Sequence, residues 1–172
     1  MAGNRGFRWV NSDFGHTSPP VQNLAMKCST TFYNGQAVKL SAAAGICSVG
    51  LPTAADTALY GYIVGDHTTT ASEKTTRAQI VPFIPGHNYE VVGASSTMTG
   101  VALYYLNLRA SLQTQTGLVN HRLNTAATFL FKIVGYKETV NTAFNSTATG
   151  AGRKWIVQIL STACQYSQTT EA

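Results

Sequence analysis

The feature that most constrains this chain is a series of short apolar runs separated by turn residues, with no amphipathic helix longer than two turns among them. Runs such as residues 36–40 and 155–159 alternate apolar and polar side chains, a pattern typical of strands that bury one face. About nine or ten such runs, spaced by about 8 to 15 residues, predict an all-β fold that is a single antiparallel β-barrel or β-sandwich.

Several runs allow more detailed predictions. The dipeptide Asn34-Gly35 predicts a β-hairpin between residues 29–33 and 36–40. Pro82 lies inside an apolar run and has no backbone N–H, so it favours an edge strand. Residues 66–76 are rich in threonine without periodicity and predict an exposed loop. The clearest core strand spans residues 125–134, with these side chains on one face: Ala127, Phe129, Phe131 and Ile133.

Residues 101–112 are ambiguous. The alternation of Ala102, Tyr104, Leu106 and Leu108 fits a strand. One face of a helix would instead be formed by Val101, Tyr104, Tyr105, Leu108 and Leu112. The strand is favoured, and the helix remains an alternative.

The first 25 residues predict an extended N-terminal arm, followed by a β domain over residues 26–172. The arm begins with two arginines and two large aromatics and continues through polar, proline-broken sequence that cannot bury a face. Arginine and tryptophan are enriched among the residues that dominate protein interfaces, so we expect the arm to bind a neighbouring molecule. The alternative is that the aromatics fold back onto the β domain. The predicted contact residues are Arg5, Phe7, Arg8 and Trp9.

The composition favours protein contacts over nucleic-acid binding. Only 11% of the residues are charged, compared with about 25% in ordinary soluble domains. A surface of hydroxyls and amides is buried against a partner at lower desolvation cost than one of lysine and glutamate. The net charge is +5, but the cations are scattered singly along the sequence rather than clustered, as nucleic-acid surfaces usually require.

The sequence offers little for catalysis, and we predict that the protein is not an enzyme. Asp66-His67 is the nearest approach to a base with its orienting acid, but it lacks a nucleophile in a recognisable setting. Neither phosphate-binding glycine motif occurs, and three cysteines without a Cys-x-x-Cys pair predict buried, reduced thiols. We therefore expect no cofactor, no metal ion and no catalytic residue.

No run of the sequence approaches the length of a membrane span, and the first residues lack the pattern of a signal peptide. These two observations predict synthesis in a cytoplasm and no membrane partner.

Six stretches of the sequence, in this order, resemble a group of tailed-bacteriophage head proteins known as capsid decoration or cement proteins. They are residues 5–8 (RGFR), 32–40 (FYNGQAVKL), 59–65 (LYGYIVG), 84–91 (IPGHNYEV), 131–136 (FKIVGY) and 154–159 (KWIVQI). The chain departs from the family at Trp9, where a proline commonly follows the arginine of the arm, and in the loop 68–76.

The resemblance implies a virion structural protein that is made in the host cytoplasm and bound in many copies to the capsid surface. Its partners would be the major capsid protein and other copies of itself, with a homotrimer favoured and a dimer possible. The alternatives are a tail, collar or fibre-anchor component of the virion and, less favoured, a nucleic-acid-binding β-barrel. A carbohydrate-binding module is a further alternative, with Asn88, Tyr89 and the loop 68–76 as candidate contacts.

Overall fold

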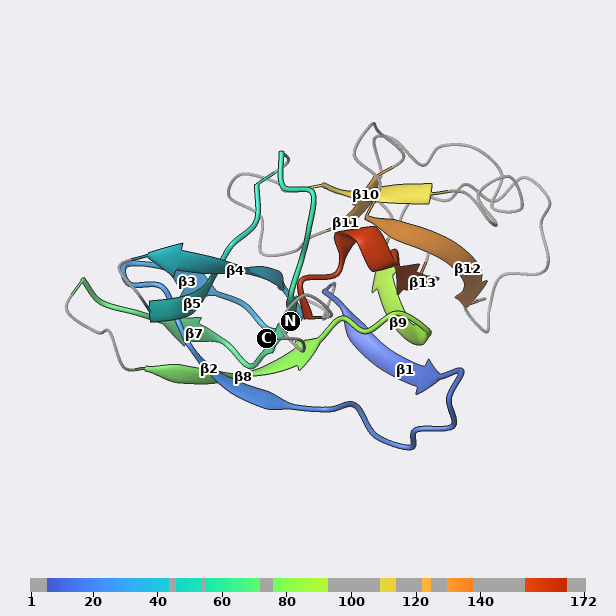
Figure 1. Ribbon diagram of the computed structural model, residues 1–172, viewed down its shortest axis with the longest axis horizontal. Helices are drawn as coiled ribbons and strands as arrows, with labels where there is room; N and C mark the ends of the chain where they lie inside the picture. The colour runs from blue at the N-terminus through green and yellow to red at the C-terminus, as the bar shows by residue number, and fades with distance from the viewer. Residues whose placement is uncertain are drawn as a thin grey trace.

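The computed structural model describes residues 6–43, 46–53, 55–71, 76–92, 109–113, 122–124, 130–137 and 154–166. It confirms the predicted all-β class, because the described residues form β-strands whose ladders are all antiparallel and one short 3-10 helix, η2 (Ser161–Ala163). Two main sheets lie beside each other (Figure 1). No sheet closes into a barrel within the described ranges.

The larger sheet has the strand order β1-β9-β13-β12-β10-β11. It takes one strand from the beginning of the chain and the others from the second half, so its outermost strand β1 is remote in sequence from its neighbour β9. Its strands are β1 (Arg8–Ser12), β9 (His87–Val92), β13 (Lys154–Ile159), β12 (Phe131–Lys137), β10 (Arg109–Gln113) and β11 (Arg122–Asn124).

The second sheet has the order β2-β8-β6-β4-β5 and curls strongly. A bridge joins Met26 to Val49, and the N–H of Lys27 donates to the carbonyl of Val49 at 2.9 Å, so the two outermost strands approach each other without forming a ladder. Its strands are β2 (Gln22–Ala25), β8 (Arg77–Pro82), β6 (Gly61–Val64), β4 (Ala37–Ala43) and β5 (Ile46–Gly50), and a separate pair is formed by β3 (Thr31–Phe32) and β7 (His67–Thr68).

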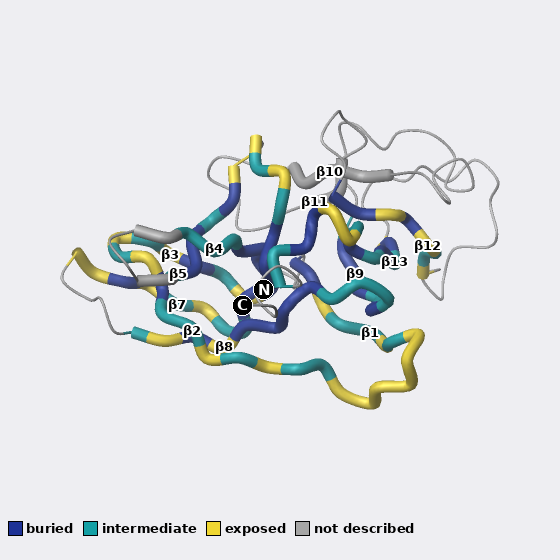
Figure 2. The backbone as a smooth tube through the Cα atoms, in the orientation of Figure 1, coloured by how far each residue is buried: buried dark blue, intermediate teal, exposed yellow. Residues whose placement is uncertain are grey.

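Two hydrophobic clusters fill the molecule, because the central strands of the curled sheet bury both of their faces. On β6, Tyr62 packs in the cluster shared with the six-stranded sheet, whereas Ile63 points into the curl of its own sheet. Ala37 and Val38 on β4 divide in the same way. Figure 2 shows the buried segments gathered in the interior, around which exposed loops run.

The predicted N-terminal arm is instead part of both sheets. β1 pairs with β9, and β2 pairs with β8, so the segment expected to project supplies an outer strand to each sheet. Only the connection between β1 and β2 is mostly exposed, over residues 13–18 (Figure 2). The segment folds back because Phe7 and Trp9 pack in and against the larger core cluster, and because the backbone groups of β1 and β2 complete two sheets that would otherwise end in β9 and β8.

Phe7 and Gly6 explain how this segment enters the molecule. The Phe7 ring is 1% exposed and lies between Phe83 and Phe131, at centroid distances of 5.0 and 5.2 Å. Its N–H donates to the carbonyl of Gly35 at 2.7 Å. A Cβ atom on Gly6 would lie only 2.5 Å from the backbone of Gly35, so the two chain segments can cross this closely only because neither residue has a side chain.

The prediction of a β-hairpin at Asn34-Gly35 is wrong, because the strands on either side of it do not pair with each other, although the turn itself is present. The N–H of Gln36 donates to the carbonyl of Tyr33 at 3.0 Å, and Gly35 alone has a positive φ, of 82°. A two-residue hairpin of the Asn-Gly kind needs positive φ at both central positions, so the flanking strands diverge here. β3 pairs with β7, and β4 pairs with β5 and β6.

Two further expectations for single strands are corrected. β8 lies between β2 and β6 and is not an edge strand. It tolerates Pro82 because that residue ends the strand, beyond its ladder with β2, and faces Gly61 on β6. The threonine-rich segment also contains the strand β7 and the buried Thr69, whose hydroxyl donates to the carbonyl of Lys27 at 2.7 Å.

The two clearest core predictions agree with the structure where it describes them. Phe131 and Ile133 on β12 are fully buried, and Trp155, Val157 and Ile159 on β13 face the same cluster. Residues 125–129 and 101–108 lie outside the described residues, and within the ambiguous region 101–112 the strand β10 begins at Arg109.

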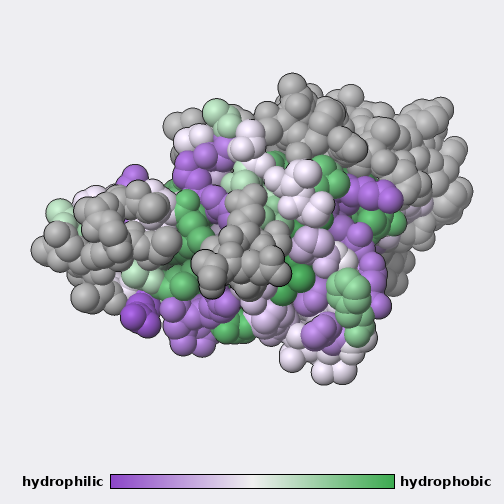
Figure 3. All heavy atoms as spheres, in the orientation of Figure 1, coloured by the Kyte–Doolittle hydropathy of each residue, from purple (hydrophilic) through white to green (hydrophobic). Residues whose placement is uncertain are grey.

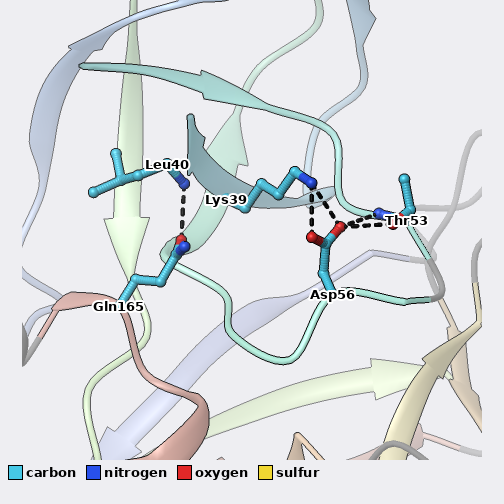
Figure 4. Close-up of polar contacts among 5 residues, drawn as sticks. All are labelled: Lys39, Leu40, Thr53, Asp56 and Gln165. Carbon is cyan, nitrogen blue, oxygen red and sulfur yellow. Dashed lines mark hydrogen bonds and ion pairs between the residues drawn. The ribbon is translucent and has the colours of Figure 1, made fainter. Parts of the chain in front are cut away.

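Strand β4 is fastened both to the connection between β5 and β6 and to the C-terminal segment (Figure 4). Lys39 on β4 forms an ion pair with Asp56 at 2.7 Å, and Thr53 donates to the same carboxylate from its hydroxyl and its N–H. Burial alone would raise the pKa of Asp56, but the hydrogen bonds from Lys39 and Thr53 outweigh it and lower that pKa. Gln165 accepts a hydrogen bond from the N–H of Leu40 at 2.8 Å.

The position of Phe7 predicts that it contributes to stability rather than to direct binding. Phe7→Ala should lower the free energy of unfolding by about 3 to 5 kcal/mol, because it removes a fully buried ring from the centre of the larger cluster. Phe14→Ala is the matched control, since that ring is 69% exposed and should change stability by less than about 0.5 kcal/mol. Urea denaturation measures both, and equal effects of the two variants would contradict this assignment.

Candidate binding surface

The outer face of the six-stranded sheet carries a dense set of polar and charged groups among the described residues. On β13, Trp155, Val157 and Ile159 point into the core, so Lys154, Ile156 and Gln158 point outward. The same alternation on β9 and β12 places polar and small aliphatic side chains on the outer face. Together with those from β1 they are Arg8, Asn11, Asn88, Glu90, Lys132, Val134 and Lys137.

Glu90 is the centre of an ion cluster at one end of this face. Its side chain is only 7% exposed, and its carboxylate lies 2.8 Å from the Lys137 ammonium, 2.9 Å from that of Lys154 and 3.6 Å from the Arg8 guanidinium. Burial alone would raise the pKa of Glu90, but hydrogen bonds and charge attraction from Lys137 and Lys154 outweigh it and lower that pKa. The carboxylate therefore stays ionised and holds three cations from three strands.

A network of amides occupies the other end. The Asn88 amide donates to Asn11 at 2.7 Å and to Asp13 at 3.0 Å, and the Gln158 amide donates to Asp13 at 2.7 Å and to Asn88 at 3.1 Å. These side chains come from β1, the turn that follows it, β9 and β13. The network therefore also holds β1 against the sheet.

Between these two clusters lies an open groove of about 560 Å³. Its floor is aliphatic and formed by Val10, Val134, Gly135 and Ile156, and Val134 is 38% exposed. The pairing of β12 with β13 shifts register between Ile133 and Gly135, and this bulge contributes to the depression. The groove thus combines an apolar floor with cations at one end and hydrogen-bonding amides at the other.

A second cluster lies where the turn after β1 meets the start of β9. The indole N–H of Trp9 donates to Nδ1 of His87 at 3.2 Å, and the His16 ring lies 5.3 Å from the His87 ring. Burial lowers the pKa of His87, the nearby His16 lowers it further, and Asp13 offsets part of this effect. The 2% exposed His87 is thereby held neutral, with Nδ1 as the acceptor.

The structure separates the four predicted contact residues of the arm. Phe7 is buried and cannot reach a partner. Trp9 is half-buried, and its backbone N–H donates to the hydroxyl of Tyr62 at 3.0 Å. Of the three that the structure describes, only Arg8 is exposed, with 61% of its side chain accessible on the outer face of the sheet. Arg5 lies outside the described residues.

The other candidates raised by the sequence serve local structure. Asp66 accepts a hydrogen bond from the N–H of Asn34 at 2.7 Å, and Nε2 of His67 lies 3.0 Å from the carbonyl of Val64, so each side chain binds a different backbone group. Tyr89, a candidate for carbohydrate contact, is fully buried, and its hydroxyl donates to the carbonyl of Pro82. This excludes it from an exposed stacking platform.

Among the cysteines, Cys164 is buried as predicted and Cys28 is half-buried, and neither forms a disulfide with a residue that the structure describes. Tyr60 and Tyr62 are buried in the two hydrophobic clusters. Over the described ranges, no group of three histidine, cysteine, aspartate or glutamate residues is suited to hold a metal ion. No helix within those ranges is long and apolar enough to cross a membrane.

Comparisons with models of protein families, with curated proteins and with solved structures find no match to this chain.

The ion cluster leads to a prediction about Glu90. Glu90→Gln should lower the free energy of unfolding at pH 7 by about 1 to 3 kcal/mol, because three cations then face each other without a carboxylate. The lowered pKa means that the contribution of Glu90 is present above its ordinary value of about 4.3 and is lost as the pH falls through its folded-state value. Urea denaturation should therefore show the deficit shrinking as the pH falls below the ordinary pKa of a glutamate, about 4.3. A deficit that does not change with pH would contradict an electrostatic origin.

The lowered pKa of His87 predicts a separate pH window. Below about pH 6.5 the unfolded chain binds a proton at this residue while the folded protein does not, so stability should fall from about pH 6.5 toward the folded-state pKa. His87→Gln keeps an acceptor for the Trp9 indole but cannot bind the proton, and it should flatten the slope between about pH 7 and pH 5. Thermal unfolding at several pH values tests this, and an unchanged slope in the variant would contradict it.

Proposed function

We propose that this protein is a structural component of a virion that binds the assembled capsid shell in many copies and stabilises it, without a catalytic role. The partners would be the major capsid protein and further copies of this chain, with a trimer favoured. The observation that carries the proposal is the outer face of the six-stranded sheet, where an aliphatic groove, cations and amides form a surface suited to protein contact.

The segments that resemble capsid decoration proteins support the same conclusion. Five of the six segments contribute a strand to one of the two main sheets. The first segment, residues 5–8, leads into β1, which begins at Arg8. Three of them, residues 84–91, 131–136 and 154–159, contribute β9, β12 and β13, which form most of the outer face. The resemblance and the candidate surface therefore coincide in the same strands.

The surface composition also fits repeated protein contact. Hydrophilic and hydrophobic residues are interspersed on the face viewed in Figure 3. Modest contacts of this kind act together when one protein spans neighbouring subunits, since the second contact is effectively intramolecular. A protein that binds the assembled shell but not free subunits stabilises the shell through linkage.

The first test is the number of copies per particle. Quantitative mass spectrometry of purified particles should find hundreds of copies of this chain, in proportion to the major capsid protein. About a dozen copies would instead identify a vertex, collar or tail component, because such positions occur at few symmetry sites. Absence from the particles would contradict any virion role.

The second test is shell stability. Particles with bound protein should retain their DNA to a higher temperature than particles stripped of it. When the free concentration of the protein is 100 times its dissociation constant, binding stabilises each occupied site of the shell by about 2.7 kcal/mol. Release of DNA can be followed with an intercalating dye during heating. Identical release temperatures for stripped and decorated particles would contradict a stabilising role.

A further inference from the structure

We infer that the groove on the outer face of the six-stranded sheet, here called the sheet groove, is the docking site for an extended acidic segment of the shell protein. This inference rests on the proposed function and deepens it, since it assigns the contact to particular strands and specifies the chemistry of the partner. It also relocates the contact from the predicted arm to a surface in which Arg8 is one of several cations.

The floor of the sheet groove favours a polypeptide. Val10, Val134 and Ile156 provide short aliphatic contacts. Tyr136 also lines the groove, and its half-buried ring packs 5.8 Å from that of Trp155, against the larger core cluster. Sugars and bases are commonly bound by stacking on exposed rings, whereas Tyr136 is the single aromatic among the described lining residues and its half-buried ring is held against Trp155. Short side chains of an extended strand fit such a floor.

The charge of the face favours an acidic partner. Within the described part of this face, the four cations Arg8, Lys132, Lys137 and Lys154 stand against two carboxylates, Glu90 and Asp13, which leaves two net positive charges. Glu90 keeps its neighbouring cations in place, and the side chains of Lys137 and Lys154 remain 43% and 46% exposed. A carboxylate of the partner placed at this end would complete the ion cluster and favour rapid association.

The amide end of the sheet groove suits a peptide backbone. Asn88 and Gln158 use their amide N–H groups within the network, and Asn11 uses its amide oxygen. In the described structure the Asn11 amide nitrogen and the Gln158 amide oxygen make no hydrogen bond. One is a donor and the other an acceptor, which matches the carbonyl and N–H that an extended chain presents.

Gly135 allows the groove to be filled with little effect on the fold. A Cβ atom at this position would meet only Ile156, at 3.7 Å, which is ordinary van der Waals contact. Gly135→Ala should therefore fold normally while raising the floor of the groove. Gly50→Ala is its matched control in the other sheet, where the added Cβ would meet only Lys27, at 3.6 Å.

Lys132 allows the charge of the face to be changed without breaking an ion pair. It lies opposite Gln158 in the ladder between β12 and β13, is exposed, and has no carboxylate partner in the described structure. Lys132→Glu changes the net charge of the face by two units. Lys27→Glu is the matched control, because Lys27 is an exposed cation next to the curled sheet.

The test measures binding of the full chain and the four variants to purified shells that lack it, after thermal unfolding has shown that each variant is folded. Wild type should bind, and Lys132→Glu should weaken binding by about tenfold, with a steeper loss on adding salt for wild type than for the variant. Gly135→Ala should weaken binding by about threefold, and both controls should bind within about twofold of wild type.

Each other outcome overturns a defined part of the inference. If wild type binds shells and the groove variants bind equally well, the sheet groove is not the docking site, although the proposed function stands. Equal weakening by the groove variants and their controls leads to the same conclusion. If wild type binds no shells, both proposals fail. Binding to single-stranded DNA that Lys132→Glu abolishes would replace the acidic protein segment with a nucleic acid.

Discussion

The burial of Phe7 is the interaction on which the arrangement of the two sheets depends. Its ring lies between Phe83 and Phe131, and its backbone is held against Gly35, the turn residue that leads into the curled sheet. The close crossing of Gly6 and Gly35 makes that position accessible. Through these contacts the beginning of the chain joins elements that are remote from it in sequence, and it fixes where β1 starts.

The position of β1 in turn creates the candidate surface. Once Phe7 is buried, Arg8 must point outward and Trp9 inward, because side chains alternate along a strand. Arg8 then reaches Glu90, and the chain after β1 brings Asp13 to Asn88 and Gln158. The same strand therefore completes the core on its inner face and the groove on its outer face. A change that displaced Phe7 would disrupt both, which is why stability and binding must be measured separately.

The candidate surface was predictable from the sequence only in part. Arg8 was identified, because two arginines beside two aromatics form a local signal. The ion cluster and the amide network were missed, since most of their contacts join strands that are remote in sequence, and no local pattern connects Asn11 to Asn88 or Glu90 to Lys154. A usable signal was nevertheless present on β13, where Lys154 and Gln158 alternate with buried apolar residues and are thereby placed on an outer face. The contact between His16 and His87 was missed for the same reason, because the two residues are far apart in the sequence although their rings lie 5.3 Å apart in the folded protein.

The sequence by itself determined the all-β class and the inward faces of strands such as β12 and β13, because those properties follow from the period-two alternation of neighbouring side chains. Only the tertiary structure decided which strands pair. The positive φ of Gly35 without a matching one at Asn34 sends β3 to β7 instead of β4, and the place available between Phe83 and Phe131 draws Phe7 inward. Both outcomes depend on residues far along the chain, whose combined packing free energy outweighs the local preference for a hairpin or a free arm.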